Sequence, residues 1–372
     1  MRKILILLSI CFLFSGCMEA RELKERTIIE AVGIDRDDGE YSLIFQQYQP
    51  EAGQKAGEGS GKSKPVESTG KSISEAIDRV THYNGNPVFL GNITYIVIGE
   101  DMAKKGILQE LHYFNGENEI SPTTMLVVAD GSAKELLSAQ AQSESGNSAI
   151  RDILKQGQEN GVIGECTLLN VMKRLMEEGT SPFLPVISNL GDEEESNLKI
   201  TGMAVFDREK MADVVPIDEA KGILWLNDEI DRALLTVESE ELGILSAEVQ
   251  ESKTVISVSL QEGKPQFHVD ITCAAQLKEV IGGESEGTLN QSEMDAAQQL
   301  FTDEITRLCS SAVERCFIND RCDVFRFASY LKKNYPDFWQ NRRTPWNEMM
   351  DDCNVTIQAD CRLSKTGQQA VG

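Results

Sequence analysis

The sequence predicts a mixed α/β protein of the α+β type, because two different hydrophobic patterns divide the chain. The first half alternates short apolar runs with segments of helical periodicity, which is typical of strands and helices that follow one another. The second half contains runs in which apolar and polar residues alternate one by one, which is typical of strands with one wet face. We therefore expect a multi-domain chain with an N-terminal mixed α/β part and a C-terminal antiparallel sheet with helices packed on it.

The first elements form a predicted hairpin. Residues 27–35 and 41–49 have the character of strands, and Asp38-Gly39 between them favours a tight turn. Residues 51–65 follow, with glycine, lysine, serine and glutamate in place of apolar side chains. A segment with so little to bury is expected to be a mobile loop.

Capping signals mark the next helices. Ser72 with Glu75, and Ser132 with Glu135, have the spacing of capping boxes, in which a serine side chain accepts a hydrogen bond from the third helical residue. The other elements expected in this half are strands at 93–98 and 123–129 and helices at 102–114 and 168–178.

The acidic run at 192–195 is a predicted linker between a domain at 17–190 and a domain at 198–372. Residues 198–206 and 211–215 predict a hairpin at the start of the second domain, and a small middle subdomain near 198–240 is left open. The later elements are expected as strands at 267–277 and 355–363 and helices at 293–315 and 324–334.

The N-terminus has the pattern of an exported lipoprotein. Arg2 and Lys3 precede an apolar run at 4–14, and Ser15-Gly16 supplies small side chains directly before Cys17. The run is too short to span a bilayer, which takes about 20 helical residues. We expect residues 1–16 to be a signal peptide and Cys17 to carry fatty acyl chains such as palmitate, leaving a lipid-anchored ectodomain. An ordinary secreted protein with Cys17 in a discarded leader is the alternative.

The charge of the chain excludes two classes of partner. The formal net charge is −24 at pH 7, and it becomes more negative when the basic leader is removed. Such a surface repels nucleic acids and anionic lipid headgroups. Attachment to a membrane must therefore come from acyl chains, and two chains suffice for stable anchoring.

The cysteines are interpreted as structural. Of nine, Cys11 leaves with the leader and Cys17 carries the lipid, so an odd number remains, and no two of them form a C-x-x-C pair. This count supports neither a complete set of disulfides nor a zinc site. Cys273 and Cys361 fall on apolar faces of predicted strands. Buried thiols are therefore favoured over redox or nucleophilic groups.

Two segments resemble ion-binding or phosphate-binding motifs but are better explained as turns and loops. Gly61-Lys62-Ser63 lacks the required glycine of a phosphate-binding loop, because Ala56 stands in its place. The aspartates at 35, 37 and 38 fit a hairpin turn, since no glutamate completes a calcium-binding loop.

No catalytic motif emerges from the rest of the chain. H-E-x-x-H does not occur, and the three histidines are scattered. Trp339 and Trp346 flank a basic segment, and we interpret them as half-buried caps on the sheet in preference to a contact surface. The sequence therefore predicts neither an enzyme nor a cofactor.

Several segments together resemble the spore germination lipoproteins, the C subunits of nutrient germinant receptors. The likeness begins after the lipid cysteine, with Arg21-Glu22-Leu23 and Ala31-Val32-Gly33-Ile34-Asp35. It continues through Leu90-Gly91-Asn92-Ile93, and through a middle signature formed by 202–206 and 221–226. It ends in Lys332-Lys333-Asn334-Tyr335-Pro336 and the two tryptophans, so it covers nearly the whole chain.

The resemblance implies a three-part ectodomain on the outer face of the inner spore membrane. It would act beside two integral membrane subunits, of the A and B types, to trigger germination by nutrients, without catalysis. Arg21 and Glu22 lie just past the anchor, so we expect them to contact those subunits.

Two other functions remain open at this point. A solute-binding lipoprotein of a transporter would need two lobes of parallel α/β sheet with a cleft between them, which the alternating C-terminal strands fit poorly. A thiol or metal enzyme would bind metal in the purified protein.

Overall fold

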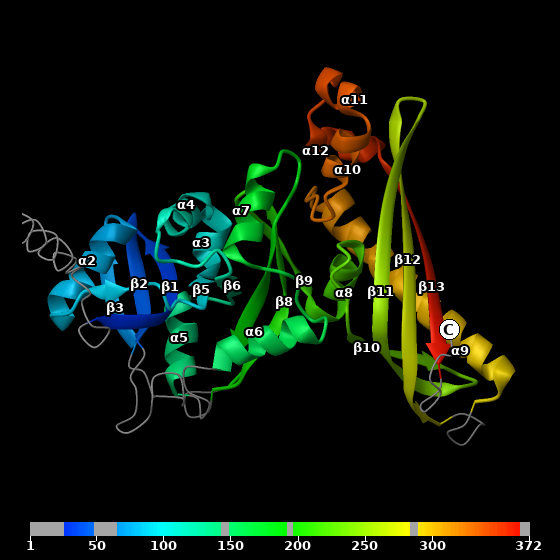
Figure 1. Ribbon diagram of the computed structural model, residues 1–372, viewed down its shortest axis with the longest axis horizontal. Helices are drawn as coiled ribbons and strands as arrows, with labels where there is room; N and C mark the ends of the chain where they lie inside the picture. The colour runs from blue at the N-terminus through cyan, green and yellow to red at the C-terminus, as the bar shows by residue number, and fades with distance from the viewer. Residues whose placement is uncertain (1–25, 48–64, 143–148, 192–195, 283–288, 365–372) are drawn as a thin grey trace, which may run out of the picture.

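The computed structural model describes residues 26–47, 65–142, 149–191, 196–282 and 289–364. These residues form two β-sheets, one of nine strands and one of four. The nine-stranded sheet and its helices occupy the N-terminal side of the molecule, and the four-stranded sheet stands beside them (Figure 1). The predicted mixed α/β class is confirmed. The predicted leader, most of the loop at 51–65 and the linker at 192–195 lie outside the described residues.

Parallel strands form the middle of the nine-stranded sheet. β1, β5, β6 and β7 run parallel, β2 and β3 add antiparallel strands at one end, and β8 and β9 do so at the other. Every residue of β5 is buried, as expected for a strand covered on both faces. The strands are β1 Thr27–Asp37, β2 Glu40–Gln47, β3 Pro65–Gly70, β4 Val88–Phe89, β5 Tyr95–Ile98, β6 Met125–Ala129, β7 Phe183–Asn189, β8 Leu198–Asp207 and β9 Lys210–Pro216.

The predicted turns and caps of this part are confirmed. Asp38 and Gly39 connect β1 to β2 with φ angles of 44° and 87°, the left-handed values that such a turn requires. Ser72 Oγ accepts a hydrogen bond from Glu75 N at 3.1 Å, and Ser132 Oγ accepts one from Glu135 N at 3.0 Å. The helices are α2 Ile73–Asn84, α3 Glu100–Lys105, α4 Leu108–Gly116, α5 Ala133–Gln142, α6 Ala149–Glu159 and α7 Leu168–Met176.

Two features of this part differ from the prediction. The single helix expected at 102–114 is two helices, because Gly106 adopts a φ of 130° between them. The first sheet is continuous across the predicted linker, since β8 pairs with β7 from Leu198↔Asn189 to Val205↔Phe183. The hairpin at the start of the predicted second domain thus completes the first sheet.

The four-stranded sheet has the order β10-β11-β12-β13. The first three strands are antiparallel, as predicted, but β13 pairs in parallel with β12. The reason is visible in Figure 1: α9 carries the chain back along the sheet, so β13 starts at the same end as β12. The strands are β10 Ala233–Ser239, β11 Gly243–Gln261, β12 Lys264–Ile281 and β13 Asn354–Ser364.

The two helices predicted in this part are present with small shifts, and three short helices join them. α9 continues as a π-helix, η3, and α10 begins late because Arg326 has a left-handed φ of 65°. The helical elements are α8 Ile217–Leu226, α9 Gln291–Ala312, η3 Val313–Asn319, α10 Phe327–Asn334, α11 Pro336–Asn341, α12 Trp346–Met349 and the 3₁₀ turn η4 Met350–Asp352.

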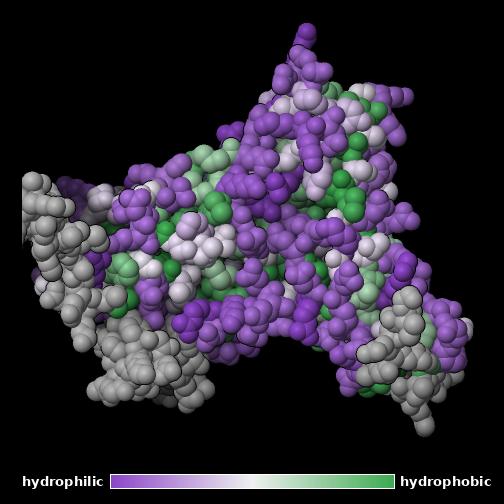
Figure 2. Space-filling model, in the orientation of Figure 1, coloured by the Kyte–Doolittle hydropathy of each residue, from purple (hydrophilic) through white to green (hydrophobic). Residues whose placement is uncertain are grey.

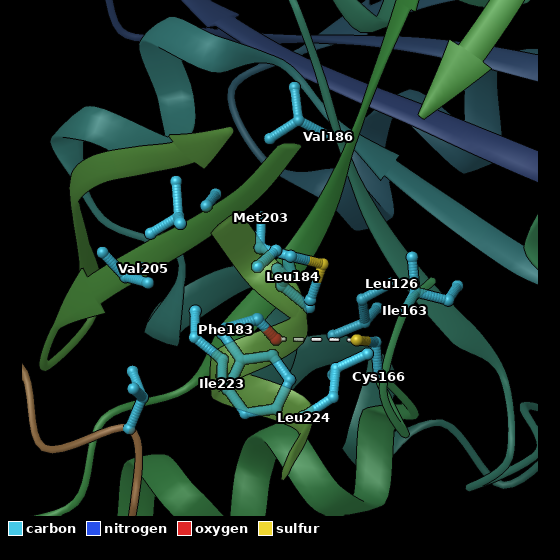
Figure 3. Packing of buried hydrophobic residues seen from close by; sticks show 14 of the residues in the cluster. Leu126, Ile163, Cys166, Phe183, Leu184, Val186, Met203, Val205, Ile223 and Leu224 are labelled. Carbon is cyan, nitrogen blue, oxygen red and sulfur yellow. Dashed lines mark hydrogen bonds between the residues drawn. The ribbon is translucent and has the colours of Figure 1, made fainter. Parts of the chain in front are cut away.

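Helix α8 joins the two parts. Ile223 and Leu224 pack with Phe183, Leu184 and Met203 of the first sheet, as Figure 3 shows. On its other side α8 approaches α9 so closely that a Cβ on Gly222 would lie 2.2 Å from the carbonyl oxygen of Leu308. A glycine is needed there because any larger residue would push the helices apart.

Candidate functional site

The sequence-predicted site residues Cys17, Arg21 and Glu22 lie before the first described residue, so their roles stay predictions. Two other places in the fold are candidates for function. One is the edge of the first sheet where the parallel strands end, which is the usual ligand site of open α/β sheets. The other is the junction between the two sheets.

Asp35 fills the usual ligand position at the first sheet. It stands near the end of β1, and its carboxylate accepts hydrogen bonds from Ala133 N and Lys134 N, both at 3.0 Å. These N–H groups open α5 and would otherwise be free to bind an anion. Gly99 permits this contact, because a Cβ there would lie 1.9 Å from Asp35 Oδ1. The resemblance motif that ends in Asp35 is thus explained as a helix cap.

The surroundings of Asp35 disfavour an anionic ligand. Burial raises the pKa of Asp35, and the charges of Glu135 and Asp101 raise it further, while its two backbone hydrogen bonds lower it. The interpretation of this aspartate as structural is confirmed, although its partner is a helix and not the turn. A phosphate or carboxylate would meet three acidic groups and find the helix start already occupied.

The junction holds a cleft of about 550 Å³. It lies between the end of α7, the β8–β9 turn and the segment that leads into α12, and charged side chains of both signs line it. The face of the molecule in Figure 2 is mostly hydrophilic around this region. Its charged lining residues are Glu177, Glu178, Asp207, Arg208, Glu209, Lys210, Arg321, Asp323 and Arg342.

Trp346 lines one side of the cleft, and Trp339 packs beside it. Trp339 and Trp346 are buried, with ring centroids 5.6 Å apart, so the prediction of half-buried caps on a sheet is wrong. They pack against Gly179 in the turn after α7, where a Cβ would lie 3.0 Å from Cδ1 of Trp346. Trp339 Nε1 donates to Glu178 at 3.3 Å, and Arg342 lies over the Trp339 ring while it also binds Glu178. This cluster fastens the C-terminal helices to the first part.

A second contact across the junction is polar and deeply buried. Arg174 of α7 donates to Val324 O at 2.9 Å and to Asn227 Oδ1 at 2.8 Å, and it lies 3.6 Å from Glu229. Its guanidinium also covers the ring of Phe183, 4.7 Å from the centroid. Sequence reasoning missed this group, because its members are up to 150 residues apart and match no motif.

Asp323 completes the junction. It is almost fully buried and accepts hydrogen bonds from Phe327 N at 3.0 Å and Ala328 N at 2.7 Å, the first N–H groups of α10. Burial raises the pKa of Asp323 to about 7, although its hydrogen bonds and Arg174 act in the opposite direction.

Among the seven cysteines that the structure describes, Cys353 is half-buried and the others are buried, as predicted for Cys273 and Cys361. Cys273 and Cys361 lie side by side, with their sulfur atoms 3.8 Å apart. In the part of the chain that the structure describes, no group of three or more His, Cys, Asp or Glu side chains is placed to hold a metal ion. No helix within the described ranges is long and apolar enough to cross a membrane.

Profiles of two known domains match the chain one after the other. Residues 19–189 match the domain described as spore germination protein N-terminal domain, and residues 201–367 match the one described as spore germination B3/GerAC like, C-terminal. The chain belongs to the spore germination protein family. The resemblance noted in the sequence is therefore confirmed.

Individual relatives agree with this family over almost their full length. The chain is 24% identical to spore germination protein KC of Bacillus subtilis (strain 168), covering 98% of this chain and 95% of the relative. It is 21% identical to spore germination protein B3 of the same organism, covering 97% and 96%. The crystal structure of the GerBC protein matches with a TM-score of 0.60 at 17% identity, covering 89% of this chain and 96% of that one. These names support a germination-related function, and the solved structure supports the fold.

Proposed function

We propose that this family member is a non-enzymatic, lipid-anchored subunit of a spore nutrient germinant receptor. It would stand on the outer face of the inner spore membrane, beside the integral membrane subunits of the A and B types. The observation that carries the proposal is the match of both halves of the chain, in order, to spore germination domains.

The fold supports this proposal over a solute-binding lipoprotein. A two-lobed binding protein places a parallel sheet on each side of its cleft. Here only the first sheet has a run of parallel strands, and Asp35 caps the helix at its carboxyl edge. The second sheet pairs three strands antiparallel and covers one face with α9.

Acyl chains would hold the protein at the membrane although its surface has no affinity for anionic lipids. The whole chain has a formal net charge of −24, so it has no electrostatic reason to stay at an anionic bilayer. Acyl chains on Cys17 would hold it there, and a short tether supplies an effective concentration of about 1 mM for a neighbouring protein. At this concentration even weak contacts of Arg21, Glu22 and the ectodomain surface with the integral membrane subunits would form.

The test is purification of the tagged full chain from spore membranes in mild detergent, followed by identification of the bound proteins by mass spectrometry. We expect two integral membrane subunits, and a charge-reversed Arg21→Glu variant should retain less of them than a Lys210→Glu variant does. Recovery of a permease and an ATPase in place of those subunits would support the transporter alternative and overturn the proposal.

A further inference from the structure

Two cysteines that are far apart in the sequence meet in the second sheet. Cys273 of β12 and Cys361 of β13 are register partners, and their sulfur atoms are 3.8 Å apart. Both side chains are buried on the same face of the sheet. The register is fixed on both sides, because the two strands pair continuously from Gln266↔Asn354 to Gln276↔Ser364.

The backbone spacing suits a covalent bridge. Neighbouring strands lie about 4.8 Å apart, which falls within the range of about 4.4–6.8 Å that a disulfide spans between Cα atoms. Side-chain rotation can therefore bring the sulfurs into bonding distance without moving the strands. Other thiols face different partners: Cys166, Cys322 and Cys353 each point toward a backbone carbonyl oxygen.

We propose that Cys273 and Cys361 form a disulfide in the exported protein. This inference rests on the part of the proposed function that places the chain outside the cytoplasm, where disulfides persist. The oxidant would be a disulfide, either of a thiol–disulfide oxidoreductase or of a small thiol compound.

The reaction balances as two exchange steps. The thiol of one cysteine loses its proton, and the resulting thiolate attacks a sulfur of the oxidant. The S–S bond of the oxidant breaks, a mixed disulfide forms, and the other half of the oxidant leaves as a thiol that has taken up the proton. The second cysteine then loses its proton and attacks the protein sulfur of that mixed disulfide, which releases the second thiol. The pair loses two electrons and two protons, and the oxidant gains them. Because both sulfurs are buried in the folded state, the exchange takes place while β13 is docking.

The disulfide would hold the edge strand β13 in the sheet and close a loop that contains the helices between β12 and β13. β13 is the last strand of its sheet, and the 88-residue separation between the two cysteines includes α9 to α12. These helices carry Trp339 and Trp346, which contact the first part of the molecule. A cross-link around so long a loop stabilises mainly by restricting the unfolded chain. The disulfide would thus also stabilise the contacts that these two tryptophans make at the junction.

The experiment is thiol trapping of the native full chain. Spores are broken in the presence of iodoacetamide, and the protein is purified from membranes. A sample is then unfolded in guanidinium with fresh iodoacetamide, so that buried free thiols also react, and its peptides are mapped by mass spectrometry without reduction. We expect a cross-linked pair of peptides that contains Cys273 and Cys361, about 2 Da lighter than the two free peptides together. Reduction should lower the melting temperature of the purified protein by several degrees. It should do the same in a Cys316→Ser control but have no effect in the Cys273→Ala/Cys361→Ala variant.

Carbamidomethylation of both cysteines in the membrane-purified native protein would overturn the inference, whether or not the variants fold. The outcome is distinguishable from failure of the receptor proposal. Membrane fractionation of the same sample reports export and anchoring, and co-purified subunits report assembly, whereas the peptide map reports only the bond.

Discussion

Helices α5 and α10 begin in the same way in two different regions of the molecule. Asp35 binds the first N–H groups of α5 at the edge of the first sheet, and Asp323 binds those of α10 at the junction. The bond lengths are alike, but Asp323 is almost fully buried whereas solvent reaches Asp35. Burial raises the pKa of both carboxyl groups, and it raises that of the more deeply buried Asp323 to about 7.

The difference separates two kinds of site. At the first sheet a carboxylate closes the position where related architectures bind ligands, at little energetic cost. At the junction, the first part of the molecule contacts the C-terminal helices and the segment before them. The residues that make these contacts are Arg174, Asp323, Trp339 and Trp346. We therefore expect a change of pH to act more strongly on the junction than on the edge of the first sheet.

The packing of Trp346 should give the largest effect. Trp346→Ala removes a buried ring between Gly179 and Trp339, so we expect a loss of about 3–5 kcal/mol in the free energy of unfolding. Urea denaturation followed by circular dichroism measures it. Trp346→Phe is the matched control and should cost much less, since Trp346 Nε1 has no hydrogen-bond partner among the described residues. A loss below about 1 kcal/mol for the alanine variant would show that the ring does not support the junction.

How far the sequence predicts this arrangement depends on the pattern of each segment. β12 was predictable because buried and exposed residues alternate along it. α8 was not, because its second half, 222–226, is buried on every side and therefore has no alternation of polar and apolar faces to detect. β7 was not predicted either; it contains Pro185, and proline is rare inside strands. The contacts of Asp35 and Arg174 could not be predicted, since their partners lie 98 and 150 residues away.

The pH dependence of Asp323 should be the second effect. Its pKa is about 7 in the folded protein and 3.8 in the reference state, so the folded state binds the proton more tightly. The contribution of Asp323 to the free energy of unfolding is at most about 4 kcal/mol. It is fully present below about pH 4 and is lost as the pH rises to about 7. Asp323→Asn does not titrate. The free energy of unfolding of this variant, measured by urea titration and compared with that of the wild type, should therefore increase between pH 4 and pH 7. A constant difference between the two proteins across that range would contradict the raised pKa of Asp323.

The cap at the first sheet should give the smallest change. Asp35→Ala leaves Ala133 N and Lys134 N without their acceptor, so we expect a loss of about 1–2 kcal/mol in the free energy of unfolding. Asp35→Asn keeps one acceptor and should lose less. Neither variant should bind phosphate, as isothermal titration calorimetry can test. Phosphate binding by Asp35→Ala, but not by the wild type, would show that the carboxylate masks a working anion site.

Anchoring of the protein at the spore membrane through acyl chains on Cys17 is best tested with a Cys17→Ala variant. Spores that carry this variant are assayed for nutrient-triggered germination, and the same spores are fractionated into membrane and soluble protein. A conservative change at a buried thiol, Cys316→Ser, serves as the control for folding. We predict that the Cys17→Ala protein is folded but soluble, and that its spores respond poorly to the receptor's nutrient while they germinate normally through unrelated receptors. Normal germination with the variant protein wholly soluble would contradict both the anchor and the receptor role.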